Sequence, residues 1–143
     1  MMKIMQNQIA LESLPDGTSL ETTAFYSGVP FSHYGIVQRA WSGGVLIHHN
    51  SKKYGGAVTT NFFEFTDGQN LARVDSIPET LGEGWVRAER ARNDVALGIR
   101  WTVDNNCEDM KSRALTGHNG SPTRNAFVGI GVLGLGLFFL SKL

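Results

Sequence analysis

The sequence predicts an α+β fold, in which a small antiparallel sheet of about four strands is packed with helices. Two patterns support this prediction: residues 19–60 contain short β-rich runs separated by turn residues, and a helical period begins after Asp75. The chain has 143 residues, of which 41% are hydrophobic, and this suits one core that folds without disulfides. We therefore expect one domain over 1–123, followed by a linker and an apolar tail over 124–143.

The expected strands come first along the chain. Apolar and polar residues alternate over 18–26, after a turn signal at 15–17. Two further β-rich runs, 33–41 and 44–49, are separated by Ser42, Gly43 and Gly44, which predicts a β-hairpin. A fourth run covers 56–65. These four runs can form the small antiparallel sheet.

The first long helix is expected shortly after Asp75. Ser76 and Glu79 have the spacing of a capping box, with Pro78 in the first turn. Gly98 would end this helix. The residues expected to face the core recur at helical spacing: Trp85, Ala88, Ala91 and Val95.

A second helix is expected after a short strand over 99–103. Asn105 or Asn106 can cap its start, and Gly117 suits its end. Cys107, Met110 and Ala114 recur along one face at spacings of three and four residues. Glu108 and Asp109 fall in the first turn, where negative charge is favoured.

Charge and cysteine usage exclude several classes of function. Thirteen basic and thirteen acidic residues cancel, so we expect no nucleic acid partner. One cysteine can form neither an internal disulfide nor a four-cysteine zinc site. His48 and His49 are adjacent, but neighbouring strand residues point to opposite faces and no acidic cluster accompanies them. We therefore expect neither a metal nor a cofactor.

Cys107 has two interpretations from residue type alone. It could be a small buried apolar side chain, as free cysteines often are. It could also be a nucleophile, because the amide groups and dipole at a helix N-terminus stabilise a thiolate. A nucleophilic thiol needs an imidazole to accept its proton, and hairpin pairing can bring His33 close to either His48 or His49.

The order of three motifs resembles the lecithin:retinol acyltransferase-like domain. These motifs are "HYGIV" at 33–37, "VLIHHNSKKYGGAV" at 45–58, and "NNCE" at 105–108, followed by Gly117 and Ser121. The resemblance extends from about Leu14 to Ser121. It implies a circularly permuted papain-like cysteine fold, in which the histidines precede the cysteine in the sequence.

The resemblance also implies roles for individual residues. His33 would be the base, and Cys107 would be the nucleophile that becomes acylated. The third polar residue falls on His48, which the pattern "LIH" favours, or on His49, which the pattern "HNS" favours. The implied activity is acyl transfer or hydrolysis on an ester or amide through a thioester on Cys107. Asp109 and Met110 depart from the usual "NCEHF" pattern.

The C-terminal segment from Ala126 to Leu140 contains no polar side chain. A helix of this length would extend about 22 Å, against roughly 30 Å for a bilayer core, and Lys142 could lengthen its reach. We expect it to anchor the protein in a membrane, which makes a lipid the favoured acyl-bearing substrate. The alternatives are packing on the domain or on a partner.

The N-terminus has no apolar run of signal-peptide length, so we expect an intracellular protein. The terminal tripeptide SKL also matches a peroxisomal signal, which is an alternative address.

Two rival functions follow from the same residues. The departures at Asp109 and Met110, together with the tail, are compatible with a membrane-tethered binding protein that has lost activity. A papain-like peptidase or amidase would keep the nucleophile and act on peptides.

Overall fold

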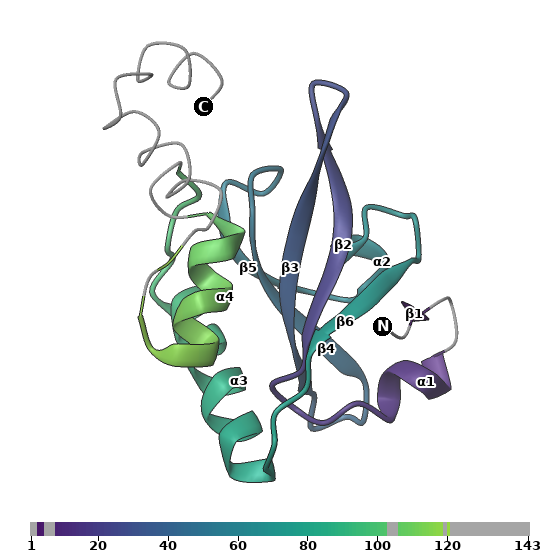
Figure 1. The fold of residues 1–143 in the computed structure, drawn as a ribbon, viewed down its shortest axis with the longest axis vertical. Coiled ribbons are helices and arrows are strands. Elements are labelled where there is room, and N and C mark those ends of the chain that lie inside the picture. The colour runs from purple at the N-terminus through teal and green to yellow at the C-terminus, as the bar shows by residue number, and fades with distance from the viewer. Residues whose placement is uncertain (1–2, 5–7, 103–105, 119, 121–143) are drawn as a thin grey trace, which may run out of the picture.

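The computed structural model describes residues 3–4, 8–102, 106–118 and 120, and its elements are labelled in Figure 1. The strands are β1 (Lys3–Ile4), β2 (Ser19–Tyr26), β3 (Val29–Arg39), β4 (Val45–Ser51), β5 (Gly56–Thr60) and β6 (Ala72–Ser76). The helices are α1 (Gln8–Glu12), α2 (Phe62–Phe65), α3 (Leu81–Ala96) and α4 (Cys107–Thr116).

The strands form one antiparallel sheet in the order β1-β6-β2-β3-β4-β5. The predicted α+β class with an antiparallel sheet is therefore confirmed. The sheet is larger than the four strands expected, because β6 pairs with β2 and the two-residue β1 pairs with β6. Residues 72–76 had no strand prediction, because the alternation of Ala72 and Val74 with Arg73 and Asp75 extends over only two periods.

Two hairpins position the middle of the sheet. Ser27 and Gly28 both have positive φ, of 51° and 78°, and connect β2 to β3 by a tight turn of the kind that matches strand twist. The predicted hairpin around Ser42 to Gly44 joins β3 to β4, with the Ala40 amide donating to the Gly44 carbonyl at 2.8 Å. β3 thus pairs with β2 over Val29–Ile36 and with β4 over Ile36–Arg39.

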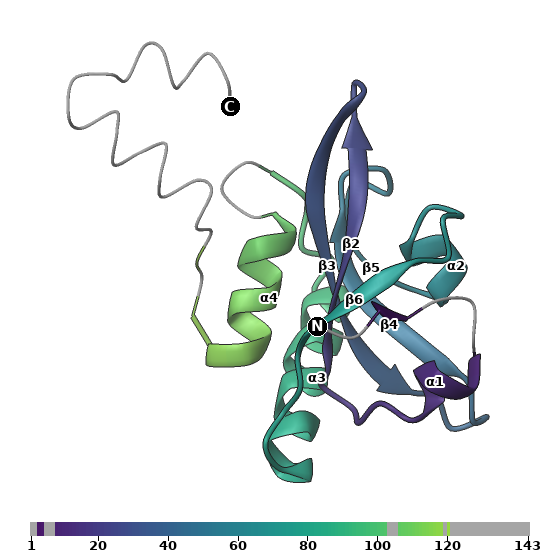
Figure 2. The ribbon, with the colours of Figure 1, turned by 45° about the vertical axis from the view of Figure 1, so that its right-hand side comes forward.

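The two faces of the sheet are covered by different helices. Figures 1 and 2 show α3 and α4 on one face, with α1 and α2 on the other side. Ile36 packs with Ala91, Met110 and Ala114 under α3 and α4. Val37, the next residue of β3, packs in the opposite core with residues such as Leu14 and Phe65. Alternation along β3 therefore decides which layer each side chain enters.

The strand predicted over 56–65 is shorter in the structure. β5 ends at Thr60, and α2 begins after Asn61, whose side chain accepts a hydrogen bond from the Glu64 amide at 2.8 Å. The aromatic residues read as β-formers instead place Phe62 and Phe65 in the core from a single helical turn.

α3 begins later than predicted. Ser76 ends β6, and the N-cap of α3 is Thr80, whose hydroxyl accepts a hydrogen bond from the Glu83 amide at 3.0 Å. Thr80 and Glu83 have the same spacing as the predicted pair, four residues further along. Ala88 and Ala91 are buried as expected, whereas Trp85 is 59% exposed because it lies to one side of the buried face of α3, which includes Gly84 and Arg87.

The segment after Gly98 makes isolated bridges at Arg100, which pairs with Gly56, and at Thr102, and its described residues do not form the predicted strand over 99–103. Val103 lies outside the described residues. α4 agrees closely with its prediction: Asn106 is the N-cap, Gly117 follows the last turn with a φ of 82°, and Cys107, Met110 and Ala114 are buried.

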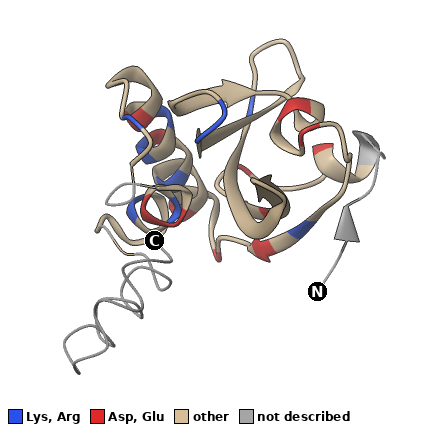
Figure 3. Cartoon of the chain, turned by 90° about the horizontal axis from the view of Figure 1, so that it is seen from above, with Lys and Arg blue, Asp and Glu red and all other residues tan. Residues whose placement is uncertain are grey.

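Acidic and basic residues are interspersed along the described chain, and both signs occur on α3 and α4 (Figure 3). One ion pair ties these helices together, with Arg113 Nη2 at 2.7 Å from Asp94 Oδ2. Among the described residues, no helix is both long and apolar enough to cross a membrane. The predicted tail from Ala126 to Leu140 lies outside them.

Candidate active site

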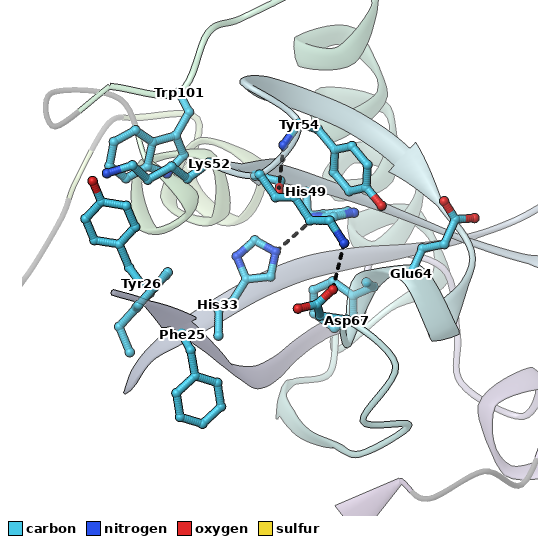
Figure 4. A pocket seen from close by; sticks show the side chains of 14 residues that line it. Phe25, Tyr26, His33, His49, Lys52, Tyr54, Glu64, Asp67 and Trp101 are labelled. Carbon is cyan, nitrogen blue, oxygen red and sulfur yellow. Dashed lines mark hydrogen bonds and ion pairs between the residues drawn. The ribbon is translucent and has the colours of Figure 1, made fainter. Parts of the chain in front are cut away.

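Two buried histidines meet on the α2 side of the sheet. His33 of β3 and His49 of β4 are 6% and 1% exposed, and His33 Nε2 lies 2.9 Å from His49 Nδ1 (Figure 4). Both rings also pack against Phe65, with centroid distances of 5.3 and 5.2 Å. The pairing of Ile36 with His48 places Gly35 opposite His49, so His33 and His49 are diagonal neighbours on one face.

One set of tautomers satisfies all the hydrogen bonds around this pair. The Thr60 hydroxyl donates to the Asn61 carbonyl, so it accepts from His49 Nε2–H at 2.8 Å. His49 Nδ1 is then an acceptor, and His33 Nε2–H donates to it. This leaves a lone pair on His33 Nδ1, which has no hydrogen-bond partner in the described part of the chain.

The sheet is open beside His33. β3 pairs with β4 only over Ile36–Arg39, so residues 32–35 have no partner in β4. Val37 exchanges backbone hydrogen bonds on the β2 side. Because successive residues direct their amides and carbonyls to opposite edges, the backbone groups of Ser32 and Tyr34 face β4 across this opening.

Cys107 contacts β3 where this strand has no partner in β4. Its Sγ lies 3.6 Å from the Ser32 carbonyl oxygen, and the Tyr34 backbone amide hydrogen-bonds the sulfur. The thiol therefore contacts the backbone on both sides of His33.

The start of α4 holds the cysteine in place. The Asn106 side chain accepts from the amides of Glu108 and Asp109, and the Asp109 carboxylate accepts from the Asn106 amide at 3.0 Å. Asp109, which departs from the expected motif, thus completes the capping box. Met110, the other departure from that motif, is buried between α4 and the sheet, where it packs with Ile36.

Burial keeps all three groups uncharged near neutral pH. Desolvation raises the pKa of Cys107 to about 11, and the Glu108 charge adds to this, while the amides of Tyr34, Cys107 and Glu108 oppose it. Desolvation lowers the pKa of His33 to about 4. Desolvation and the neighbouring histidines lower the pKa of His49 to about 2.

His48 points to the other face of the sheet. Its ring nitrogens lie 2.7 Å from Thr59 Oγ1 and 2.7 Å from Gln38 Oε1. Burial, followed by the charge of Arg92, lowers its pKa to about 4. The structure thus brings His49 to His33, although the pattern "LIH" had favoured His48, because adjacent residues of a regular strand diverge.

The histidine pair lies at a cavity of about 370 Å³. Its apolar walls are side chains such as Phe31 and Phe65, and Cys107 is not one of the lining residues. The rim is aromatic and charged: Tyr26, Lys52, Lys53, Tyr54, Glu64, Asp67 and Trp101 (Figure 4). These rim residues were not predicted from the sequence. The basic and aromatic run at 52–54, directly after β4, was the signal that could have found them.

Within the described ranges, no group of three or more histidine, cysteine or acidic side chains could hold a metal ion.

Together, the fold and the site define an α+β protein with a buried, oriented histidine pair and a cysteine that begins a capped helix and contacts the strand carrying one of these histidines. Comparison with protein-family models, curated proteins and solved structures finds no match to this chain.

Proposed function

We propose that this protein is a thiol enzyme that transfers or hydrolyses the acyl group of an ester or amide. Cys107 is the nucleophile, His33 is the base, and His49 is a positioning residue that fixes the His33 tautomer. The observation that carries the proposal is the binding of the Cys107 thiol to the backbone on both sides of His33.

The proposed reaction follows the general chemistry of activated thiols. The Cys107 proton passes to His33 Nδ1 as the sulfur attacks the carbonyl carbon. The Cys107 backbone amide, which does not donate to the Asn106 cap, stabilises the resulting oxyanion. His33 returns the proton to the leaving alcohol or amine, which leaves a thioester. Water or another acceptor then attacks the thioester, gives its proton to His33 and releases the acyl product, and the proton returns to the thiol.

The neutral resting state sets the order of these events. Since burial raises the pKa of Cys107 and lowers that of His33, the pair holds one proton on sulfur at pH 7. Proton transfer must therefore accompany attack on bound substrate, rather than precede it.

The resemblance to the lecithin:retinol acyltransferase-like domain supports the same roles and adds a circularly permuted papain-like fold to the proposal. A lipid substrate, membrane attachment and an intracellular location are part of it. They depend on the ends of the sequence, including Ala126 to Leu140, which lie outside the described residues.

The test is the intact mass of the full chain after incubation with 4-nitrophenyl octanoate. We expect an octanoyl adduct on Cys107 that is absent from Cys107→Ser. Acylation should fall by about 10²–10⁴-fold in His33→Gln, the range for loss of a general base. His48→Gln is the matched control, because His48 is equally buried but faces away. An adduct of equal yield in Cys107→Ser would overturn the proposal.

A second candidate is a binding protein without catalysis. It is favoured by the burial of Cys107, which is 4% exposed and lies outside the set of cavity-lining residues. If wild type takes up no acyl group, and Cys107→Ala retains both a bound ligand and biological function, this candidate is selected. Cleavage of peptide amides without action on acyl esters would select a peptidase or amidase.

A further inference from the structure

A cation is held at the rim of the cavity by aromatic rings. Lys52 directly follows β4, three residues after His49. Its Nζ lies 3.2 Å from the centroid of the Tyr26 ring and 4.7 Å from that of Trp101 (Figure 4). Ring faces attract a cation but carry no net charge. The ammonium group is thereby positioned without being neutralised.

The neighbouring lysine differs in this respect. Lys53 Nζ lies 2.8 Å from Asp67 Oδ1, and both side chains are well exposed. Lys52 makes no ion pair with an acidic side chain in the described part of the chain. Lys52 is therefore the rim cation that can accept an anionic partner, and Lys53 is its internal control.

The other residues that line the cavity indicate the chemistry of the rest of such a partner. Phe25, Phe31 and Phe65 line it, and the two histidines at its floor are held neutral by burial. An apolar group would fit against these walls, while an anion on the same molecule would reach the rim.

We infer that Lys52 is an anion-recognition residue, and that the cavity takes acyl compounds that carry a carboxylate or phosphate group. This inference rests on the proposed function, because it names the class of substrate. Ligand binding alone can test it, without any chemistry at Cys107.

The experiment uses the full chain with Cys107→Ala, Trp41→Phe and Trp85→Phe. The chain has three tryptophans, and Trp41 and Trp85 are exposed, so their replacement leaves Trp101 at the rim as the fluorescent reporter. The probes are octanoate, octyl phosphate and octanamide, which share an apolar chain but differ in charge. We expect one or both anions to bind about tenfold more tightly than octanamide, as a charged hydrogen bond predicts.

Variants of the two lysines complete the test. Lys52→Met should remove the preference for anions and leave octanamide affinity unchanged, whereas Lys52→Arg and Lys53→Met should keep the preference. Persistence of the preference in Lys52→Met, or equal affinity of all three probes for the unaltered rim, would overturn the inference. The ranking of octanoate and octyl phosphate identifies the preferred anion.

Failure of the proposed chemistry gives a different result. In that case, wild type forms no acyl adduct, but the anion preference and its dependence on Lys52 remain measurable in the Cys107→Ala background.

Discussion

Cys107 combines features that usually occur apart. It begins a capped helix, where amides favour a thiolate, yet it is nearly inaccessible to solvent. Desolvation is the largest influence on its pKa and outweighs the amides. The residue therefore resembles a nucleophile in its contacts and a core side chain in its resting charge.

This balance predicts how Cys107 reacts when no substrate is present. Its pKa of about 11 leaves little thiolate at pH 7, so iodoacetamide should alkylate the folded protein more slowly than the urea-unfolded chain. The folded rate should rise steeply above pH 9. Mass spectrometry over a pH series measures both rates. Fast alkylation of the folded protein at neutral pH, lowered in His33→Gln, would instead reveal a preformed ion pair.

For single residues, the sequence indicated which residue types form the site, but not to which face of the sheet each side chain points. The motif resemblance selected His33 and Cys107, and hairpin pairing limited the third residue to His48 or His49. The choice between these two depends on register, which only the pairing of Ile36 with His48 establishes. The role of Asp109 in the cap was equally hidden, because a carboxylate beside a thiol looks electrostatically unfavourable.

Among the elements, β3 requires glycine at position 35, because neighbouring side chains leave no room for a Cβ there. A Cβ on Gly35 would lie 2.5 Å from Ile47 Cγ2 and 2.7 Å from Phe65 Cε1. The absence of a side chain lets Phe65 pack against both histidines. α2 and the histidine pair therefore depend on the same close approach.

Gly35→Ala should displace Phe65 and destabilise the protein by about 1–3 kcal/mol, the usual range for overpacking. Gly44→Ala is the control, since its Cβ would meet nothing within 4 Å. The free energy of unfolding in urea measures the difference. Equal stability of the two variants would contradict the close packing of Phe65 on β3.

Element types were predicted better than element boundaries. The central strands and both long helices were expected, because their periodic patterns extend over several turns or pleats. The boundary errors arose where two signals compete: the capping pair at Ser76 has a second copy at Thr80, and the aromatic run after Asn61 suits both strand and helix. β6 owes its existence to its neighbours β1 and β2, which a local pattern cannot show.

For the molecule as a whole, three buried histidines link stability to acidity. Their folded pKa values lie below the unfolded value of 6.5, with His33 and His48 at about 4. The unfolded chain therefore binds protons first as pH falls. The stabilising contribution is complete above pH 6.5 and is lost as pH falls toward 4, by about 1.4 kcal/mol per pH unit for each histidine.

Urea unfolding at intervals between pH 7 and pH 4 tests this linkage. His48→Gln should reduce the slope of the unfolding free energy by about one proton, because it removes one imidazole whose pKa is lowered by burial. A slope that is the same in His48→Gln and wild type would contradict the burial of an uncharged imidazole.

Asn61 has a consequence that extends from one residue to the state of the whole protein. Its carbonyl receives the Thr60 hydroxyl, and its side chain caps α2. The direction of each hydrogen bond from Thr60 to His33 thus depends on α2, a helix of one turn. Fraying of α2 would release the Thr60 hydroxyl from the Asn61 carbonyl. The two imidazoles could then exchange tautomers, which would place a proton on His33 Nδ1 in place of its lone pair. The basicity of His33 therefore depends on whether α2 is folded.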